Sequence, residues 1–272
     1  MRSVPAIDGE RMRHNFSARA GEYDRYARVQ KRVVADLVQR ISGLGPLSGP
    51  ALDIGTGTGC CAAKLCEPLP RRAVTVMDLA HGMTRQASQR LSGVNACDGD
   101  AGRLPFRSAA FQTVVSSSVY QWIPRLPEAF GEVQRVLRPG GLFAVALFGE
   151  QTLYELRSSH QHAVASSQKR VPSHVHSFPS SGDVREALLT AGVECREMIT
   201  YLDVDYHASV ADLLRELKQI GASNAAENRP RGLASRRLMQ KMMRFYEMEF
   251  REGGRFPATY EVIVALSEKV ST

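Results

Sequence analysis

The stretch Asp53-Ile54-Gly55-Thr56-Gly57-Thr58-Gly59 decides the fold of this chain. It follows the apolar residues 50–52 and precedes a segment, 60–66, that can form a helix. Glycine lets a backbone turn tightly and approach a ligand without a Cβ in the way. A second apolar run, 73–77, ends at Asp78, whose carboxylate can accept hydrogen bonds from both hydroxyls of a ribose. Together these features predict a nucleoside-binding crevice in an α/β fold.

The spacing of the glycines separates two kinds of nucleoside site. Dinucleotide folds use G-x-G-x-x-G and place a pyrophosphate on a helix N-terminus, whereas this loop is G-x-G-x-G. That form resembles motif I of class I S-adenosylmethionine (SAM) methyltransferases, in which the loop packs against the amino-acid part of SAM. Residues 78–83 resemble the ribose site of that superfamily, and residues 99–106 resemble its adenine-contacting turn. The resemblance implies SAM as the cofactor, with contacts from Asp53, Gly55, Gly57, Gly59, Asp78, Leu79, Met83, Asp100, Ala101 and Ser118.

Short apolar runs alternate with helix-compatible stretches from residue 50 to residue 148, which is typical of a parallel α/β sheet. We expect a doubly wound, mostly parallel seven-stranded sheet of the class I SAM methyltransferase (Rossmann-like) type, with helical lid insertions. Helices are expected at 10–43, 128–137 and 182–191, and late strands at 193–206 and 260–266. We divide the single domain, 1–272, into an N-terminal helical segment (1–45), a SAM-binding core (46–150), two lid insertions (151–178 and 208–257) and a terminal strand (258–272).

The composition limits the cellular setting. Hydrophobic residues make up 43% of the 272, which is enough for a packed domain. The longest strongly apolar run, 142–148, is too short to cross a bilayer, and the first residues lack the apolar core of a secretory signal. Five cysteines without a C-x-x-C pair favour a reducing cytoplasm. The net charge of +7 attracts acidic partners in general and does not choose among them.

The end of the fourth predicted strand, 111–118, lacks a catalytic base. Methyl transfer from a sulfonium is an in-line displacement that mainly requires proximity, alignment and exclusion of water. A carboxylate acceptor needs no base, whereas a phenol, an amine or a carbon acid usually does. Residues 116–122 contain no Asp, Glu or His, and the [DNS]-P-P-[YFW] motif of nucleic-acid amino methylases is absent. The sequence therefore favours an acceptor that is already a nucleophile, with no nucleic-acid partner and no membrane partner.

Several segments resemble one family more closely. Residues 16–30 are similar to the F-x-x-A-A-x-x-Y-D-x-x-A-x-x-Q opening of the malonyl-acyl-carrier-protein O-methyltransferases of biotin synthesis (the BioC type), although Arg19 replaces the first paired alanine. The resemblance continues through the S-x-x-x-Q-W segment at 117–122, the strand exit at 148–156, the lid segment at 213–222 and the strand at 257–262. It therefore covers nearly the whole chain.

This second resemblance implies a specific reaction. SAM would methylate the free carboxylate of malonyl-acyl-carrier protein or malonyl-coenzyme A, an early step of biotin (pimeloyl) synthesis in which the ester hides a charge that fatty-acid synthesis enzymes reject. We expect a cytoplasmic, monomeric enzyme whose basic surface suits an acidic carrier protein. An arginine can hold a carboxylate through two parallel hydrogen bonds. The candidates for work on the acceptor are Tyr23, Ser118, Arg236 and Arg237.

Two other functions stay open on the sequence alone. One is a small-molecule C- or O-methyltransferase of the quinone or sterol type, which would need a wider apolar pocket and often a base. The other is a catalytically silent SAM-fold protein that acts as an assembly partner. The histidine pairs 160/162 and 174/176 have a spacing that can ligate zinc on a strand, but no third ligand is evident and the segment is polar and loop-like. We therefore expect no metal.

Overall fold

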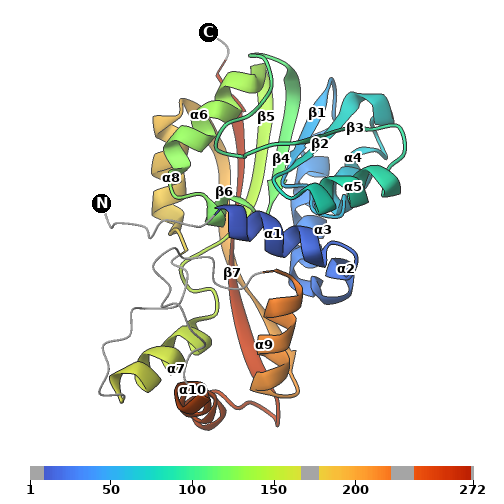
Figure 1. The fold of residues 1–272 in the computed structure, drawn as a ribbon. Coiled ribbons are helices and arrows are strands. Elements are labelled where there is room, and N and C mark those ends of the chain that lie inside the picture. The colour runs from blue at the N-terminus through green and yellow to red at the C-terminus, as the bar shows by residue number, and fades with distance from the viewer. Residues whose placement is uncertain (1–8, 167–177, 222–235, 271–272) are drawn as a thin grey trace.

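A computed structural model of the chain describes residues 9–166, 178–221 and 236–270. These residues form one twisted sheet with helices on both faces (Figure 1). The strands are β1 (Ala51–Ile54), β2 (Val74–Asp78), β3 (Asn95–Asp98), β4 (Phe111–Ser117), β5 (Leu137–Phe148), β6 (Val193–His207) and β7 (Phe256–Lys269). The α-helices are α1 (Gly9–Arg19), α2 (Tyr23–Tyr26), α3 (Arg28–Gly43), α4 (Cys60–Leu65), α5 (His81–Arg90), α6 (Leu126–Val136), α7 (Tyr154–Ala165), α8 (Ser181–Thr190), α9 (Val210–Gln219) and α10 (Arg236–Glu249). Two short 3₁₀ helices are η1 (Arg71–Ala73) and η2 (Tyr120–Trp122).

The strand order is β3-β2-β1-β4-β5-β7-β6. The first five strands are parallel, whereas β7 is antiparallel to both β5 and β6. From β1 the chain builds outward to β2 and β3 on one side and to β4 on the other. Ligands of such sheets bind beyond the carboxyl ends of the strands at this switch point. The sheet confirms the predicted doubly wound, mostly parallel fold class.

Apolar side chains fix the layers. One core cluster joins a face of the sheet to α3, α4 and α5, and a second joins the other face to α6 and α8 (Figure 1). Helix α3 buries Val29, Val33, Leu37 and Ile41, which recur at helical spacing. All four residues of β1 are buried, as expected for a parallel strand covered on both faces.

The predicted helix at 10–43 is wrong in one respect, because the chain forms three helices there. The first break follows Arg19 and the second lies at Ala27. Between them, Asp24 accepts a hydrogen bond from the Thr58 hydroxyl at 2.6 Å and pairs with Arg90 at 3.2 Å. The breaks therefore bring α2 against the glycine loop, which a continuous helix would not do.

The segment around His160 and His162 was expected to be a loop, and this expectation is wrong because it forms α7. The buried face of α7 contains polar residues, including Glu155, Ser159 and His160, so the sequence lacks a clear apolar stripe. Their burial is supported by hydrogen bonds such as that from the backbone N–H of Thr259 to Glu155, at 3.2 Å. The second histidine pair, 174/176, lies outside the described residues.

Ion pairs attach α9 to the rest of the molecule. Arg28 of α3 pairs with Asp205 of β6 and Glu216 of α9, at 2.8 Å in each case. The buried His207 lies between the same two carboxylates, and burial lowers the pKa of its imidazole. Because the Arg28 guanidinium already offsets both carboxylates, this cluster serves to join three elements. Within the described ranges, no helix is both long and apolar enough to cross a bilayer.

Candidate functional site

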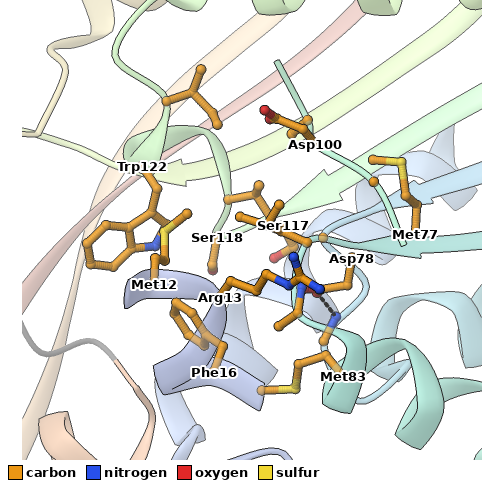
Figure 2. A pocket seen from close by; sticks show the side chains of 18 of the residues that line it. Met12, Arg13, Phe16, Met77, Asp78, Met83, Asp100, Ser117, Ser118 and Trp122 are labelled. Carbon is orange, nitrogen blue, oxygen red and sulfur yellow. Dashed lines mark hydrogen bonds between the residues drawn. The ribbon is translucent and has the colours of Figure 1, made fainter. Parts of the chain in front are cut away.

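Two adjoining cavities lie at the carboxyl ends of β1, β2 and β4. The larger has a volume of about 100 Å³ and the smaller about 50 Å³. Figure 2 shows the side chains that line the larger cavity, which come from α1, the strand ends and η2. The residues that line both cavities are Tyr23, Gly55, Gly57, Ser117 and Ser118. The two cavities therefore form a single elongated site that crosses the glycine loop.

The glycine loop gives a ligand access to bare backbone. Gly55 and Gly57 have φ values of 65° and 56°, a region that side chains other than glycine rarely adopt. A Cβ on Gly55 would lie 2.1 Å from Cγ2 of Val119, whereas a Cβ on Gly57 would meet no atom within 4 Å. The loop thus packs tightly at Gly55 and opens toward the cavities at Gly57. Gly59 is buried beside Ala87 and is not among the lining residues.

Asp78 stands where β2 ends and lines the larger cavity. Its Oδ2 accepts a hydrogen bond from the backbone N–H of Gly57 at 2.9 Å, and its Oδ1 accepts one from Ala80 at 2.8 Å. Burial raises the pKa of the carboxyl to about 6, although these backbone donors oppose the shift. A carboxylate can accept about four hydrogen bonds. Asp78 therefore keeps acceptor capacity for the hydroxyls of a ligand.

Asp53 lies in the smaller cavity with only 1% of its surface exposed. Its Oδ2 accepts hydrogen bonds from the Thr56 hydroxyl at 2.7 Å and from the backbone N–H of Ala62 at 3.0 Å. Burial raises the pKa of the carboxyl to about 7, against the effect of these two donors. Asp53 thus ties the start of the loop to the first turn of α4 and places a titratable group at the edge of the cavity.

The far end of the larger cavity combines apolar walls with one carboxylate. Met77, Leu79, Met83 and Ala101 line the same cavity as Asp100. Asp100 is exposed, and its Oδ1 accepts a hydrogen bond from the backbone N–H of Gly102 at 2.8 Å. This end can take a flat apolar group that carries a hydrogen-bond donor at its edge. The structure therefore brings together the residues predicted for ribose and adenine.

Ser117 and Ser118 carry unsatisfied hydroxyls at the centre of the site. Among the described residues, neither Oγ has a hydrogen-bond partner, and both atoms are buried. A buried hydroxyl without a partner costs about 1–3 kcal/mol. Ser118 also has a φ of 61°, a strained value for a residue with a Cβ. An orphaned polar atom in a cavity points to a polar ligand that completes its hydrogen bonding.

Tyr23 lines both cavities and joins the glycine loop to α1 through a small apolar cluster with Phe16, Ala20 and Met83. Burial, followed by the nearby charge of Asp78, raises the pKa of its phenol far above the usual range. The phenol therefore stays protonated and can donate a hydrogen bond. No glutamate or histidine of the described chain lines either cavity.

Arg236 and Arg237 are not brought to these cavities. Both are exposed at the start of α10, a helix that packs against α7 (Figure 1). Neither is among the lining residues. The arginine in the larger cavity is Arg13 of α1, which sequence reasoning missed. Helix α1 buries none of its residues, so no periodic apolar pattern marked the face that it turns to the cavity.

Comparisons with known proteins agree with this geometry. The methyltransferase domain family matches residues 52–145. A malonyl-[acyl-carrier protein] O-methyltransferase of Geobacter sulfurreducens is 40% identical over 266 residues, covering 97% of this chain and 100% of the relative. A biotin biosynthesis bifunctional protein, BioHC, of Teredinibacter turnerae is 34% identical over 93% of this chain and 45% of the relative. A solved structure of a putative methyltransferase from Bacillus halodurans has a TM-score of 0.62 at 17% identity, covering 86% of this chain and 98% of its own, which shows a shared fold.

Proposed function

Because the chain belongs to the malonyl-[acyl-carrier protein] O-methyltransferase family, we infer that it transfers the methyl group of SAM to the free carboxylate of malonyl-acyl-carrier protein. The product is a methyl ester, and the reaction belongs to biotin synthesis. The observation that carries this conclusion is the 40% identity to a relative over 97% of this chain and 100% of the relative. The family and the SAM-dependent activity predicted from the sequence are thereby confirmed. The quinone- or sterol-type and assembly-partner alternatives gain no support.

The chemistry of the two cavities fits SAM. When bound, SAM supplies an electrophilic methyl group on a positively charged sulfur. Asp78 would accept hydrogen bonds from the ribose hydroxyls, and Asp100 would accept one from the adenine amino group beside Ala101. Leu79 and Met83 would flank the base. The amino-acid part would lie against the loop of Gly55 and Gly57, in the smaller cavity where Asp53 faces it, while Gly59 shapes the loop from behind.

The acceptor side of the site suits a carboxylate. A carboxylate is already ionised at neutral pH and needs no base. This agrees with the described residues that line the two cavities, which include no glutamate and no histidine. Tyr23 and Ser118 would donate hydrogen bonds that orient the acceptor, and Ser118 also lies within reach of the cofactor side because it lines both cavities. Binding would give the orphaned Ser118 hydroxyl a partner, which favours the loaded state over the empty one.

We also propose a lid, a monomeric state and a cytoplasmic location for this enzyme. The segments 151–178 and 208–257, of which 167–177 and 222–235 lie outside the described residues, act as a lid, and α9 contacts α1. Arg19 donates to Gln219 at 2.9 Å, and Gly221 lies against Phe16. The enzyme works as a monomer. It works in the cytoplasm, where its five free cysteines stay reduced.

The test is rescue of a biotin-requiring bacterial strain that lacks the malonyl carboxyl methylation step. Expression of the wild-type chain should restore growth without added biotin. Expression of Asp78→Ala at the same level should not, because the ribose loses its acceptor. Failure of the wild type to rescue, with the protein present and able to bind SAM, would contradict the proposed function.

A further inference from the structure

The cations and carboxylates of the two cavities are unevenly distributed. The charged side chains that line the larger cavity are Arg13, Asp78 and Asp100. Those that line the smaller one are Asp24, Lys31 and Asp53. Among the described lining residues, each cavity thus holds one cation, and Lys31 stands on the side proposed for the amino-acid part of SAM. Arg13 lines the larger cavity together with Tyr23 and Ser118, the two residues proposed to orient the acceptor.

Arg13 is placed to meet a ligand rather than another part of the protein. Its side chain extends from α1 into the cavity (Figure 2). Within the described residues it makes no ion pair, whereas Arg28, Arg32 and Arg40 of α3 are all paired with carboxylates at 3.1 Å or less. The Arg13 side chain is exposed and, among the described residues, has no carboxylate partner, so a carboxylate of a ligand can reach it.

We propose that Arg13 holds the malonyl carboxylate and so selects acceptors that carry a negative charge, an inference that rests on the proposed function. A guanidinium presents two parallel N–H donors to a carboxylate and stays charged at every physiological pH. With one carboxylate oxygen held, an oxygen lone pair forms the new bond to the methyl carbon. The carbon–sulfur bond breaks and leaves its electron pair on sulfur, so that the sulfonium becomes a neutral thioether. The acceptor becomes a neutral ester, and no proton moves.

The loss of charge during the reaction determines which kinetic constant Arg13 controls. The ion pair is strongest with the fully charged acceptor and weakens as the carboxylate gives up its charge to the methyl group. Binding that is stronger in the ground state than in the transition state lowers KM without raising kcat. The neutral ester then has no ion pair to break when it leaves. Arg13 thus serves recognition of the acceptor and release of the product, and not the chemical step.

The experiment compares Arg13→Gln and Arg13→Lys with the wild type, using SAM with malonyl-coenzyme A and with malonyl-carrier protein. Arg13→Gln should raise the KM of both acceptors about 10- to 100-fold, the range expected for loss of a charged hydrogen bond. Its kcat should be unchanged or higher, and its affinity for S-adenosylhomocysteine should be unchanged, which also shows that the variant is folded. Arg13→Lys should recover part of the loss. Arg185→Gln removes a charge from the exposed face of α8 and should change none of these values.

Three results would overturn the inference while leaving the proposed function intact. An unchanged KM would show that Arg13 does not meet the acceptor. A defect with the carrier protein alone would place Arg13 in carrier docking. A matching loss of affinity for S-adenosylhomocysteine would place it on the cofactor. If the wild type itself binds S-adenosylhomocysteine but methylates neither acceptor, the proposed function fails.

Discussion

The carboxylate of Asp78 is bonded to the backbone of Gly57, whose N–H donates to Oδ2 at 2.9 Å. This bond joins the end of β2 to the middle of the glycine loop, across the seam where the two cavities meet. A side chain that fixes the loop is therefore the same side chain that offers acceptors to a ribose. A substitution at Asp78 therefore changes both the conformation of the glycine loop and the binding of the ribose.

Cofactor affinity should depend on pH through Asp78. Burial raises its pKa to about 6, and only the ionised form can accept hydrogen bonds from both ribose hydroxyls at full strength. Affinity for S-adenosylhomocysteine should therefore rise with pH through about 6 and level off above it. Asp78→Asn should lower the affinity about 100-fold at pH 8, since charged hydrogen bonds contribute about 1.5–3 kcal/mol each. Titration calorimetry from pH 5 to 8 checks both, and a wild-type profile that is flat across this interval contradicts the assignment.

Asp53 should make the empty protein less stable at high pH. Its folded pKa of about 7 lies above the ordinary value of 3.8 for an unfolded carboxyl, because burial disfavours the charge. Its contribution to stability is therefore complete below pH 3.8 and is lost as the pH rises through 7. Asp53→Asn keeps an acceptor for Thr56 and Ala62 without the charge.

We expect this variant to raise the free energy of unfolding by on the order of 2 kcal/mol at pH 8, with a gain that shrinks toward pH 4. Urea unfolding of the cofactor-free protein at several pH values measures the effect. A gain of the same size at every pH would mean that the charge of Asp53 is not its cause.

The Ser118 hydroxyl should destabilise the empty protein and increase kcat/KM. Its Oγ is buried without a partner, whereas the Oγ of the neighbouring Ser116 donates to the carbonyl of Ile54 at 3.0 Å. Ser118→Ala should therefore stabilise the empty protein by about 1 kcal/mol and lower kcat/KM about tenfold. Ser116→Ala, the matched control, should destabilise it by a similar amount. Thermal unfolding and initial rates distinguish the two, and a Ser118→Ala protein that is destabilised and fully active would refute the assignment.

The position of α1 should depend on the absence of a side chain at Gly82. The N–H of Gly82 donates to the Ser17 hydroxyl at 2.8 Å, and a Cβ there would lie 2.5 Å from the Ser17 carbonyl oxygen. Gly82→Ala should push α1 away from α5 and raise the KM of the malonyl acceptor severalfold, with a smaller effect on S-adenosylhomocysteine.

The matched control is Gly131→Ala in α6, where a Cβ would meet nothing within 4 Å. It should leave both constants unchanged and stabilise the fold by up to about 1 kcal/mol, as alanine does in a helix. Equal acceptor KM values in the two variants would show that α1 does not cover the acceptor.

The part of the site that the sequence revealed is local. The loop of residues 53–59 and the carboxylate of Asp78 are marked by glycine spacing and by strand ends, and the sheet positions them as expected. The ends of the strands were harder to predict, because a strand extends as far as it is hydrogen-bonded to its neighbour, and the local sequence does not show this. The last strand was expected at 260–266, but it runs from Phe256 to Lys269, where it stays paired with β6 from His207 back to Val193.

The acceptor side depends on packing that short patterns do not encode. Arg236 and Arg237 lie at the start of a helix with a clear apolar stripe, yet that stripe is turned to α7 and leaves both arginines exposed. Arg13 lies on a helix with no buried residue. It reaches the cavity because contacts near the C-terminal end of α1 hold the helix in place. Ser17 contacts Gly82 of α5, and Phe16 contacts Trp122 of η2. Nothing in the local sequence of α1 specifies those contacts.

The most direct test of the account is to incubate the purified protein with SAM that carries a labelled methyl group and with malonyl-carrier protein, and then to treat the product with mild alkali. Esters are cleaved by this treatment, whereas methyl groups on carbon or nitrogen are not. The account predicts that the label transfers to the malonyl group and is released by alkali as methanol. Label that survives the treatment, or no transfer by a protein that binds SAM, would contradict it.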